Sequence, residues 1–236
     1  MNKPSISASS LTPLNFAVQS TPQHVAIIMD GNRRWASQHN LPASRGYRAG
    51  ISRLRELLPL FATSAVDTLT LFGFSAANWQ RPKNEVADLM RLAEQALNQF
   101  APLCRKQRIR VEVIGRRDRL PRSLVDRVGG ISQQTAQGRK RLRIAFDYSS
   151  REAILAAAAD IRSDRDTQAL SQNLGDAGDV DLLIRTGKEQ RLSDFLLWEC
   201  AFAELYFPDL YWPDFTAEAL ETAIAWYRAR NRTFGA

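Results

Sequence analysis

Residues 24–35 read His24-Val-Ala-Ile-Ile-Met-Asp30-Gly-Asn-Arg-Arg-Trp35, and this stretch decides the fold class of the chain. Its apolar run is short and β-prone, which is typical of a buried strand. The run stops at Asp-Gly-Asn, a turn sequence, and leads into a helix. A buried strand that passes through a glycine turn into a helix is the repeating unit of α/β folds.

The same alternation of strand and helix continues along the chain. Strands are expected at residues 24–30, 68–75, 108–115, 142–148, 180–185 and 205–207. Helices are expected at residues 44–63, 84–103, 120–137, 151–161 and 216–230. This order predicts an α/β fold with a mostly parallel central sheet, which helices flank on both faces.

The length of 236 residues is enough for one large domain that needs no disulfide or metal to hold its core. Residues 1–22 are polar and are expected to form a disordered tail, which leaves one domain over residues 23–236. Residues 163–179 are polar and rich in Asp and Gly, so we expect a mobile connection there.

The composition narrows the kind of partner that the protein binds. Hydrophobic residues make up 44% and charged residues 24%, which excludes a disordered or fibrous chain. The net charge of +7 comes mostly from arginines and indicates an anionic partner: nucleic acid, an acidic membrane or phosphate-bearing small molecules. We expect no nucleic-acid partner, because no reader motif and no repeated basic and aromatic interleaving is present.

The cysteines and the hydropathy pattern indicate a cellular location. Cys104 and Cys200 lie far apart without a C-x-x-C motif, which favours a reducing compartment. The sequence has no signal-peptide core and no run near the roughly 20 apolar residues of a membrane span, so a cytoplasmic protein is expected. Two histidines are too few for a histidine-rich metal site.

Polar residues follow the predicted strands where ligands bind in parallel α/β sheets, at the carboxyl ends. The first strand ends in Asp30, and a helix preceded by a glycine, with two arginines, can bind phosphate. A carboxylate beside such a site can hold Mg²⁺ on a diphosphate. The alternative is a helix cap with solvated arginines.

A second group follows the fifth strand, in the sequence Arg185-Thr-Gly-Lys-Glu-Gln-Arg-Leu-Ser193. Its three cations and hydroxyl indicate another anion site, whereas a solvated basic loop is the alternative. Two anion sites and one carboxylate suggest a reaction between two phosphorylated molecules. The glycine motifs of nucleotide and dinucleotide sites are absent, as is the D-D-x-x-D pattern of all-helical prenyl-chain synthases.

These blocks, in this order, resemble the cis-prenyltransferase family. The resemblance covers residues from about 23 to the C-terminus and rests on 24–35, 74–75, 78–86, 181–187, 189–198, 203–207 and 212–213. It implies a homodimer that condenses isopentenyl diphosphate with an allylic diphosphate such as farnesyl diphosphate, using Mg²⁺. The lipid product would also bring peripheral contact with a membrane.

The resemblance assigns roles by position. Asp30 is implied as the catalytic carboxylate and a metal ligand, Glu204 as a second metal ligand and Asn78 as the proton acceptor. The allylic site is implied to contain Gly31, Asn32, Arg33, Arg34, Trp35, Ser75, Trp79 and Arg81. The isopentenyl diphosphate clamp is implied to be Arg185, Arg191, Leu192 and Ser193.

The chain departs from the family pattern near the allylic site. Ala43 and Tyr47 stand where members usually carry arginine and histidine. Ala76 and Ala77 replace a serine and a glutamate, and Lys188 replaces a glycine. Two alternatives remain: a short-chain or irregular prenyl synthase, and a non-catalytic partner subunit. Apolar residues within 72–74 and 86–100 are candidates for a tunnel but are interpreted as core.

Overall fold

The computed structural model describes residues 21–159, 161 and 166–231. The strands are β1 (His24–Ile28), β2 (Thr68–Ser75), β3 (Ile109–Ile114), β4 (Lys140–Tyr148), β5 (Leu182–Arg185) and β6 (Glu204–Tyr206). The α-helices are α1 (Asn32–Gln38), α2 (Ala43–Thr63), α3 (Lys83–Lys106), α4 (Arg122–Gln134), α5 (Ser150–Ala159), α6 (Thr167–Asn173) and α7 (Ala217–Arg228). Two short 3-10 helices are η1 (Ala76–Gln80) and η2 (Trp212–Asp214).

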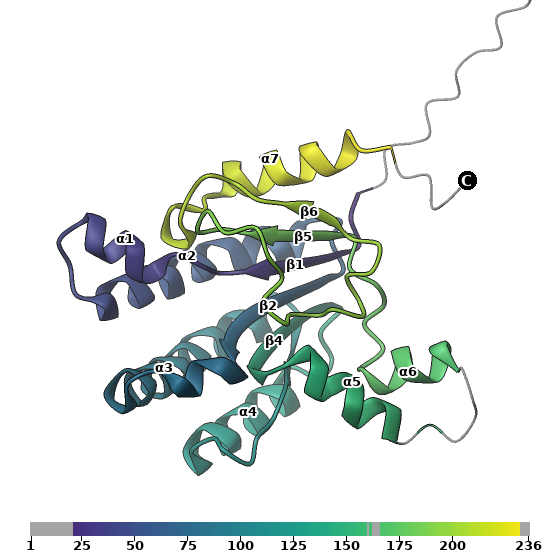
Figure 1. Cartoon of the computed structure of the whole chain (residues 1–236), viewed down its shortest axis with the longest axis horizontal. Coiled ribbons are helices and arrows are strands. Elements are labelled where there is room, and N and C mark those ends of the chain that lie inside the picture. The colour runs from purple at the N-terminus through teal and green to yellow at the C-terminus, as the bar shows by residue number, and fades with distance from the viewer. Residues whose placement is uncertain (1–20, 160, 162–165, 232–236) are drawn as a thin grey trace, which may run out of the picture.

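The six described strands form one parallel sheet in the order β3-β4-β2-β1-β5-β6. Figure 1 labels β4, β2, β1, β5 and β6 in this order. Every residue of β1 and of β5 is buried, as expected for inner strands with both faces covered. Ile28 of β1 pairs with Arg185 of β5, so these two strands end side by side. This register brings the polar segments that follow β1 and β5 to one edge of the sheet.

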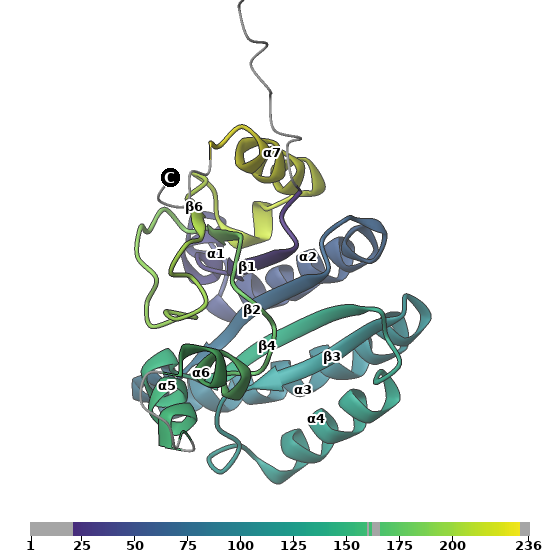
Figure 2. The ribbon, with the colours of Figure 1, turned by 90° about the vertical axis from the view of Figure 1, so that its right-hand side faces the viewer.

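The core consists of two layers, one on each face of the sheet. Alternate residues of β1 point to opposite faces: Val25 and Ile27 join one buried cluster, and Ala26 and Ile28 join the other. Helices α2, α3, α4 and α7 contribute to the first cluster. Figure 2 shows α5 and α6 on the other side of the sheet from α3 and α4.

The predicted α/β fold and its parallel sheet are confirmed. One prediction within the fold was wrong: the expected connection at residues 163–179 contains the helix α6. The Asp166 side chain caps this helix by accepting a hydrogen bond from the Ala169 N–H at 2.8 Å. Trp198 and Arg143 then donate hydrogen bonds to Ser171 and to the Leu174 carbonyl. These tertiary contacts leave no periodic signal in the sequence.

The predicted N-terminal tail and the predicted absence of a membrane span can be compared only with the residues that the structure describes. The tail expected at residues 1–22 lies outside them, apart from positions 21 and 22, and the domain boundary stays a prediction. Among the described residues, no helix is long and apolar enough to cross a membrane.

Candidate active site

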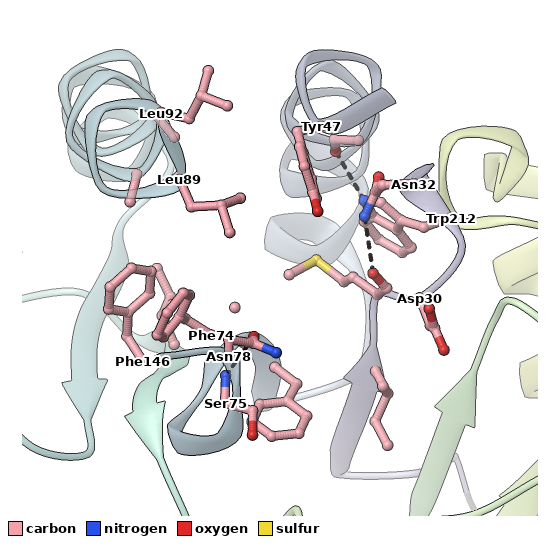
Figure 3. A pocket seen from close by; sticks show the side chains of 18 of the residues that line it. Asp30, Asn32, Tyr47, Phe74, Ser75, Asn78, Leu89, Leu92, Phe146 and Trp212 are labelled. Atoms are coloured by element: carbon pink, nitrogen blue, oxygen red, sulfur yellow. Dashed lines mark hydrogen bonds between the residues drawn. The ribbon is translucent and has the colours of Figure 1, made fainter. Parts of the chain in front are cut away.

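A cavity of about 1160 Å³ opens at the carboxyl edge of the sheet and runs inward between the sheet and helices α2, α3 and α4. We call its outer part the polar mouth, formed by Asp30, Arg34, Ser75, Asn78, Arg81, Arg185 and Ser193. We call its inner part the apolar chamber, formed by Leu89, Leu92, Ala93, Ala96, Leu97, Phe100, Phe74, Val113, Leu124, Val128, Ile144 and Phe146. Figure 3 shows Leu89 and Leu92 of α3 directed into this space, opposite Tyr47 of α2.

Asp30 lies at the centre of the polar mouth, directly after β1. Its Oδ2 accepts a hydrogen bond from Arg185 Nη2 at 2.9 Å, and its Oδ1 lies 3.0 Å from Arg34 Nη2. Partial burial alone would raise the pKa of the Asp30 carboxyl, but the hydrogen bond from Arg185 and the charge of Arg34 outweigh it and lower that pKa. Asp30 is therefore a stable anion that remains partly open to the cavity.

Two glycines let the chain approach Asp30 closely. Gly31 has a φ of 100°, and a Cβ there would lie 2.4 Å from Cδ1 of Tyr211. Gly187 has a φ of 89°, and a Cβ there would lie 2.9 Å from Nη2 of Arg34. Both positions need the left-handed backbone and the absence of a side chain, so glycine is required at each.

The segment after β5 forms the second basic group of the mouth. Arg185 is buried, and its Nη1 donates a hydrogen bond to Ser193 Oγ at 2.8 Å and another to the Arg191 carbonyl. The Nε of Arg185 is buried without a partner. Asp194 anchors the loop, because its carboxylate accepts hydrogen bonds from Ser149 Oγ at 2.6 Å and the Arg151 N–H at 3.1 Å.

Glu189 connects the two basic groups. Its carboxylate pairs with Arg34 Nη1 at 3.0 Å and also with Arg191 Nη1. Arg191 is itself exposed and does not line the cavity. The mouth thus holds its arginines on acidic side chains, which an incoming anion would have to replace.

The turn after β2 presents Asn78 to the cavity. Ser75 N donates to Asn78 Oδ1 at 3.0 Å, while Ser75 Oγ accepts from the Ala77 N–H at 3.1 Å. This reciprocal capping box begins the short helix η1 and fixes the side chains of both residues. In Figure 3, Asn78 and Ser75 lie on the side of the cavity that faces Asp30.

A third polar cluster joins α2 to α3 at the rim of the cavity. The Tyr47 hydroxyl donates to Glu85 Oε1 at 2.9 Å and accepts from Arg81 Nη1 at 2.9 Å. Arg33 Nη1 lies 3.6 Å from the same carboxylate oxygen. Burial and the neighbouring Glu85 raise the pKa of Tyr47 to about 12, so the hydroxyl stays protonated.

The structure brings most of the predicted site residues together at one cavity. Those that line it are Asp30, Gly31, Asn32, Arg33, Arg34, Ser75, Asn78, Arg81, Arg185 and Ser193. Those that do not line it are Trp35, Trp79, Arg191, Leu192 and Glu204.

The residues outside the cavity are held elsewhere by identifiable contacts. The Trp35 indole donates to Asp214 Oδ1 and stacks on His39, and the Trp79 indole donates to Asp147 Oδ1. Leu192 packs against the core cluster on the α5 side of the sheet. Glu204 begins β6 beside Leu182, the first residue of β5, so within this chain it lies toward the opposite end of the strands from Asp30. Its metal role stays a prediction.

Sequence reasoning did not place the apolar chamber in the site. Its members on α3 and β2 have the spacing and composition of core residues, and several are in fact largely buried. Of the tunnel candidates in 72–74 and 86–100, those that line the cavity include Phe74, Leu89 and Phe100, and Phe74 and Phe100 are core residues as well. A hollow between core elements has no sequence signal of its own, because the same apolar pattern is typical of a filled core.

The family described as "Putative undecaprenyl diphosphate synthase" matches residues 28–235 of the chain. The chain belongs to this family, the cis-prenyltransferases. It is 46% identical over 223 residues to "Isoprenyl transferase 1" of Bradyrhizobium diazoefficiens, which covers 92% of this chain and 91% of that protein. It is 43% identical to a farnesyl-diphosphate-specific ditrans,polycis-undecaprenyl-diphosphate synthase of Pseudomonas putida, over 93% and 92% of the two chains.

Solved structures of other cis-prenyltransferases share the fold. Lavandulyl diphosphate synthase from Lavandula x intermedia, in complex with dimethylallyl diphosphate, superposes with a TM-score of 0.88 at 33% identity, over 92% of this chain and 99% of that one. A probable undecaprenyl diphosphate synthase from Campylobacter jejuni gives 0.78 at 29% identity, over 92% and 100%. The expectation of an isoprenyl transferase enzyme is confirmed.

Proposed function

We propose that this cis-prenyltransferase condenses isopentenyl diphosphate with an allylic prenyl diphosphate, such as farnesyl diphosphate, into a cis-polyprenyl diphosphate of the lipid-carrier type. The observation that carries the proposal is the junction of the polar mouth with the apolar chamber, at Asp30, Arg34 and Arg185. A molecule with a diphosphate head and a hydrocarbon tail is complementary to both parts. Farnesyl and dimethylallyl diphosphate, named for the two relatives above, are both molecules of this kind.

Each of the two basic groups would bind the diphosphate of one substrate. Arg33, Arg34 and Arg81 would bind the allylic diphosphate next to Gly31 and Asn32, with the tail directed into the chamber. Arg185 and Ser193 line the cavity and would bind isopentenyl diphosphate, and Arg191 would join them from its exposed position by leaving Glu189. Arginine suits both tasks, because its planar fork makes two hydrogen bonds to phosphate oxygens and stabilises charge as the allylic C–O bond breaks.

Asn78 would accept the proton that leaves isopentenyl diphosphate when the new double bond forms. Its Oδ1 is oriented by the Ser75 N–H, which holds the amide at the cavity surface. A neutral amide is a weak base, so the proton must pass on to a more basic oxygen. The phosphate oxygens of the bound diphosphates are acceptors of that kind.

The residues at the mouth suit a Mg²⁺ ion that is held partly by the protein and partly by the substrate diphosphate. The described part of the chain has no group of three or more His, Cys, Asp and Glu side chains that could hold a metal. Mg²⁺ usually binds through one or two carboxylates together with substrate phosphates, and Asp30 supplies one carboxylate beside the diphosphate site. When bound, Mg²⁺ neutralises charge that develops on the leaving diphosphate.

The direct test is incubation of the purified protein with labelled isopentenyl diphosphate, farnesyl diphosphate and Mg²⁺. Products are separated by chain length and identified by mass spectrometry. We expect repeated cis additions and a dependence on Mg²⁺ that is lost with EDTA. Failure to elongate any allylic primer from C5 to C20 would overturn the proposal.

A specialised short-chain or irregular synthase is the second candidate, and the likeness to lavandulyl diphosphate synthase favours it. The departures at Ala43 and Tyr47 point the same way, since both alter the allylic side of the site. Incubation with dimethylallyl diphosphate alone separates the two candidates. Coupling of two allylic molecules supports the irregular synthase. With isopentenyl diphosphate added, a product that stops after one or a few additions supports the short-chain synthase, and a long polyprenyl product supports the first proposal.

We further propose that the enzyme is a cytoplasmic homodimer that contacts membranes peripherally through its lipid product. Phe202 and Leu205, near the edge strand β6, are 66% and 39% exposed, which supports an interface there. Cys104 and Cys200 are free and buried, which agrees with a reducing compartment. Sedimentation of the full chain, compared with Phe202→Ser, tests the dimer: the variant should shift toward monomer.

A further inference from the structure

Trp79 follows Asn78 directly in η1 but does not line the cavity. Its indole Nε1 donates a hydrogen bond of 2.8 Å to Asp147 Oδ1, in the interior of the protein. Its ring packs edge-on against Phe74, with centroids 5.4 Å apart. Adjacent residues of one short helix therefore point in different directions: Asn78 to the cavity, Trp79 to Asp147.

Asp147 is the most enclosed carboxylate at this edge of the sheet. Its side chain has no exposed area, and it accepts hydrogen bonds from Arg119 Nε to Oδ2 at 2.9 Å and from Arg119 Nη2 to Oδ1. The guanidinium of Arg119 also lies over the Trp79 ring, 5.7 Å from its centroid. Asp147, Arg119 and Trp79 thus form a closed group, which we call the Asp147 brace.

The backbone around the brace is itself unusual. Asp147 has a φ of 51°, a left-handed conformation that is uncommon for a residue with a side chain. The pairing of β2 with β4 is irregular here, with register shifts between Phe72 and Phe74 and between Phe74 and Ser75. Strained and irregular backbone persists only where surrounding contacts hold it, and it is concentrated at functional sites.

The brace and the capping box hold η1 from two sides. Ser75 fixes the amino end of η1 through Asn78 Oδ1 and the Ala77 N–H. The brace fixes the other side of the same turn through the indole N–H of Trp79. Asn78 lies between these two restraints, so its position in the cavity depends on both.

We propose that Trp79 is a positioning residue: the Asp147 brace holds its indole so that the preceding Asn78 amide is placed for the reaction. This inference rests on the proposed function, because it requires Asn78 to act in the condensation. It replaces the substrate-contact role that the family resemblance implied for Trp79. A positioning role affects the chemical step, whereas a substrate contact affects binding.

The test uses Trp79→Phe, which removes the indole N–H and retains an aromatic ring. We expect kcat to fall about tenfold while KM for both substrates changes less than about twofold, because small displacements of a reacting group are costly. Trp198→Phe is the matched control, since Trp198 also donates one indole hydrogen bond, of 2.9 Å to Ser171, far from the cavity. It should leave both constants unchanged. A rise in KM for the allylic substrate with unchanged kcat would overturn the proposal.

A double-mutant cycle with Asn78→Ala identifies the residue through which Trp79 acts. If Trp79 acts through Asn78, Trp79→Phe should cause no further loss in the Asn78→Ala background. Single-turnover measurements with excess enzyme extend the assay to slow variants, and thermal melts exclude unfolding. A tenfold loss in both backgrounds overturns the positioning role alone. Wild-type turnover in Asn78→Ala instead overturns the proposed role of Asn78.

Discussion

Asp30 and Asp147 lie at the carboxyl edge of the same sheet, at the ends of β1 and β4, and each is paired with arginine. Their surroundings differ. The Asp30 side chain is 30% exposed and faces the cavity, whereas Asp147 has no exposed area and meets only protein donors. An open carboxylate can bind a metal ion and release its arginine to a phosphate, but an enclosed one can only hold its neighbours in place.

The comparison shows that ion-pair chemistry does not by itself identify a catalytic group. Both aspartates use arginine, and both follow residues with strand character in the sequence. What separates them is whether the cavity reaches the carboxylate. Substitutions in the two regions should therefore differ in their effects on turnover and on stability.

The largest effect is expected from Asp30→Ala. Loss of a charge at the reacting diphosphate should reduce kcat by about 10³-fold or more. The melting temperature should fall as well, because buried Arg185 loses its carboxylate and keeps only neutral acceptors, Ser193 and the Arg191 carbonyl. Steady-state kinetics and calorimetry check both parts. Near-normal turnover would remove the distinction drawn between the two aspartates.

Asp147→Ala should lower kcat far less than Asp30→Ala does, by about tenfold as in Trp79→Phe, because it removes the acceptor of the Trp79 indole. Chemical denaturation should show a loss of about 3 kcal/mol, at the lower end for buried ion pairs, because Arg119 is 34% exposed and can reach water once Asp147 is removed. Asp214→Ala is the control, because exposed Asp214 accepts one indole hydrogen bond of 2.8 Å from Trp35. That variant should lose less than about 1 kcal/mol. If both variants lose the same free energy of unfolding, the burial of Asp147 does not determine its contribution to stability.

His24 is a buried titratable group at the amino ends of the strands, away from the cavity. We expect its titration to affect stability but not turnover. Burial, aided by the charge of Arg143, lowers the pKa of His24 to about 4. The unfolded chain, with a histidine pKa near 6.5, binds a proton before the folded one does. Stability should therefore fall as the pH drops from about 6.5 to about 4, by about 3 kcal/mol in total.

The measurement is urea denaturation between pH 7 and pH 4, on the wild type and on His24→Gln. The variant should lack this part of the pH dependence, since other groups titrate alike in both proteins. Parallel curves for the two proteins would contradict the assignment.

The smallest effect is expected at the rim of the mouth, from Tyr47→Phe. The change removes a hydroxyl that links Glu85 to Arg81, yet Arg81 still lies 3.2 Å from the same carboxylate. We expect KM for the allylic substrate to rise about fivefold, equivalent to about 1 kcal/mol, with kcat nearly unchanged. Tyr206→Phe, on β6 outside the cavity, is the control. A large loss of kcat would place Tyr47 with Asp30 in the reaction itself.

Much of the fold could be predicted because its elements have periodic or alternating sequences. The buried strands and the long amphipathic helix α3 are in this class. Helix α6 could not be predicted, because none of its residues is buried and it is held by hydrogen bonds from Trp198 and Arg143. Such contacts depend on the finished fold rather than on local pattern.

The site was predictable where chemistry and position coincide. Asp30 and Arg185 are polar residues at the ends of buried strands, and the structure brings them within hydrogen-bonding distance. The direction in which a side chain points was not predictable. Trp35 and Trp79 are neighbours of site residues in the sequence, but their indoles point away from the cavity. The apolar chamber was not predictable from the sequence, because its shape depends on how far the helices lie from the sheet.

The two glycines beside Asp30 limit how this enzyme can evolve. A charged residue of the mouth can be partly replaced by a neighbour of the same charge. Arg34 and Arg185, for example, both form an ion pair with Asp30. Gly31 and Gly187 both have left-handed backbone, and a side chain would meet Tyr211 at Gly31 and the Asp30 backbone at Gly187. In a saturation library selected for activity, these two positions should accept glycine alone, while arginine positions retain a few partly active variants. The least replaceable residues around Asp30 are thus two that have no side chain with which to contact the substrate.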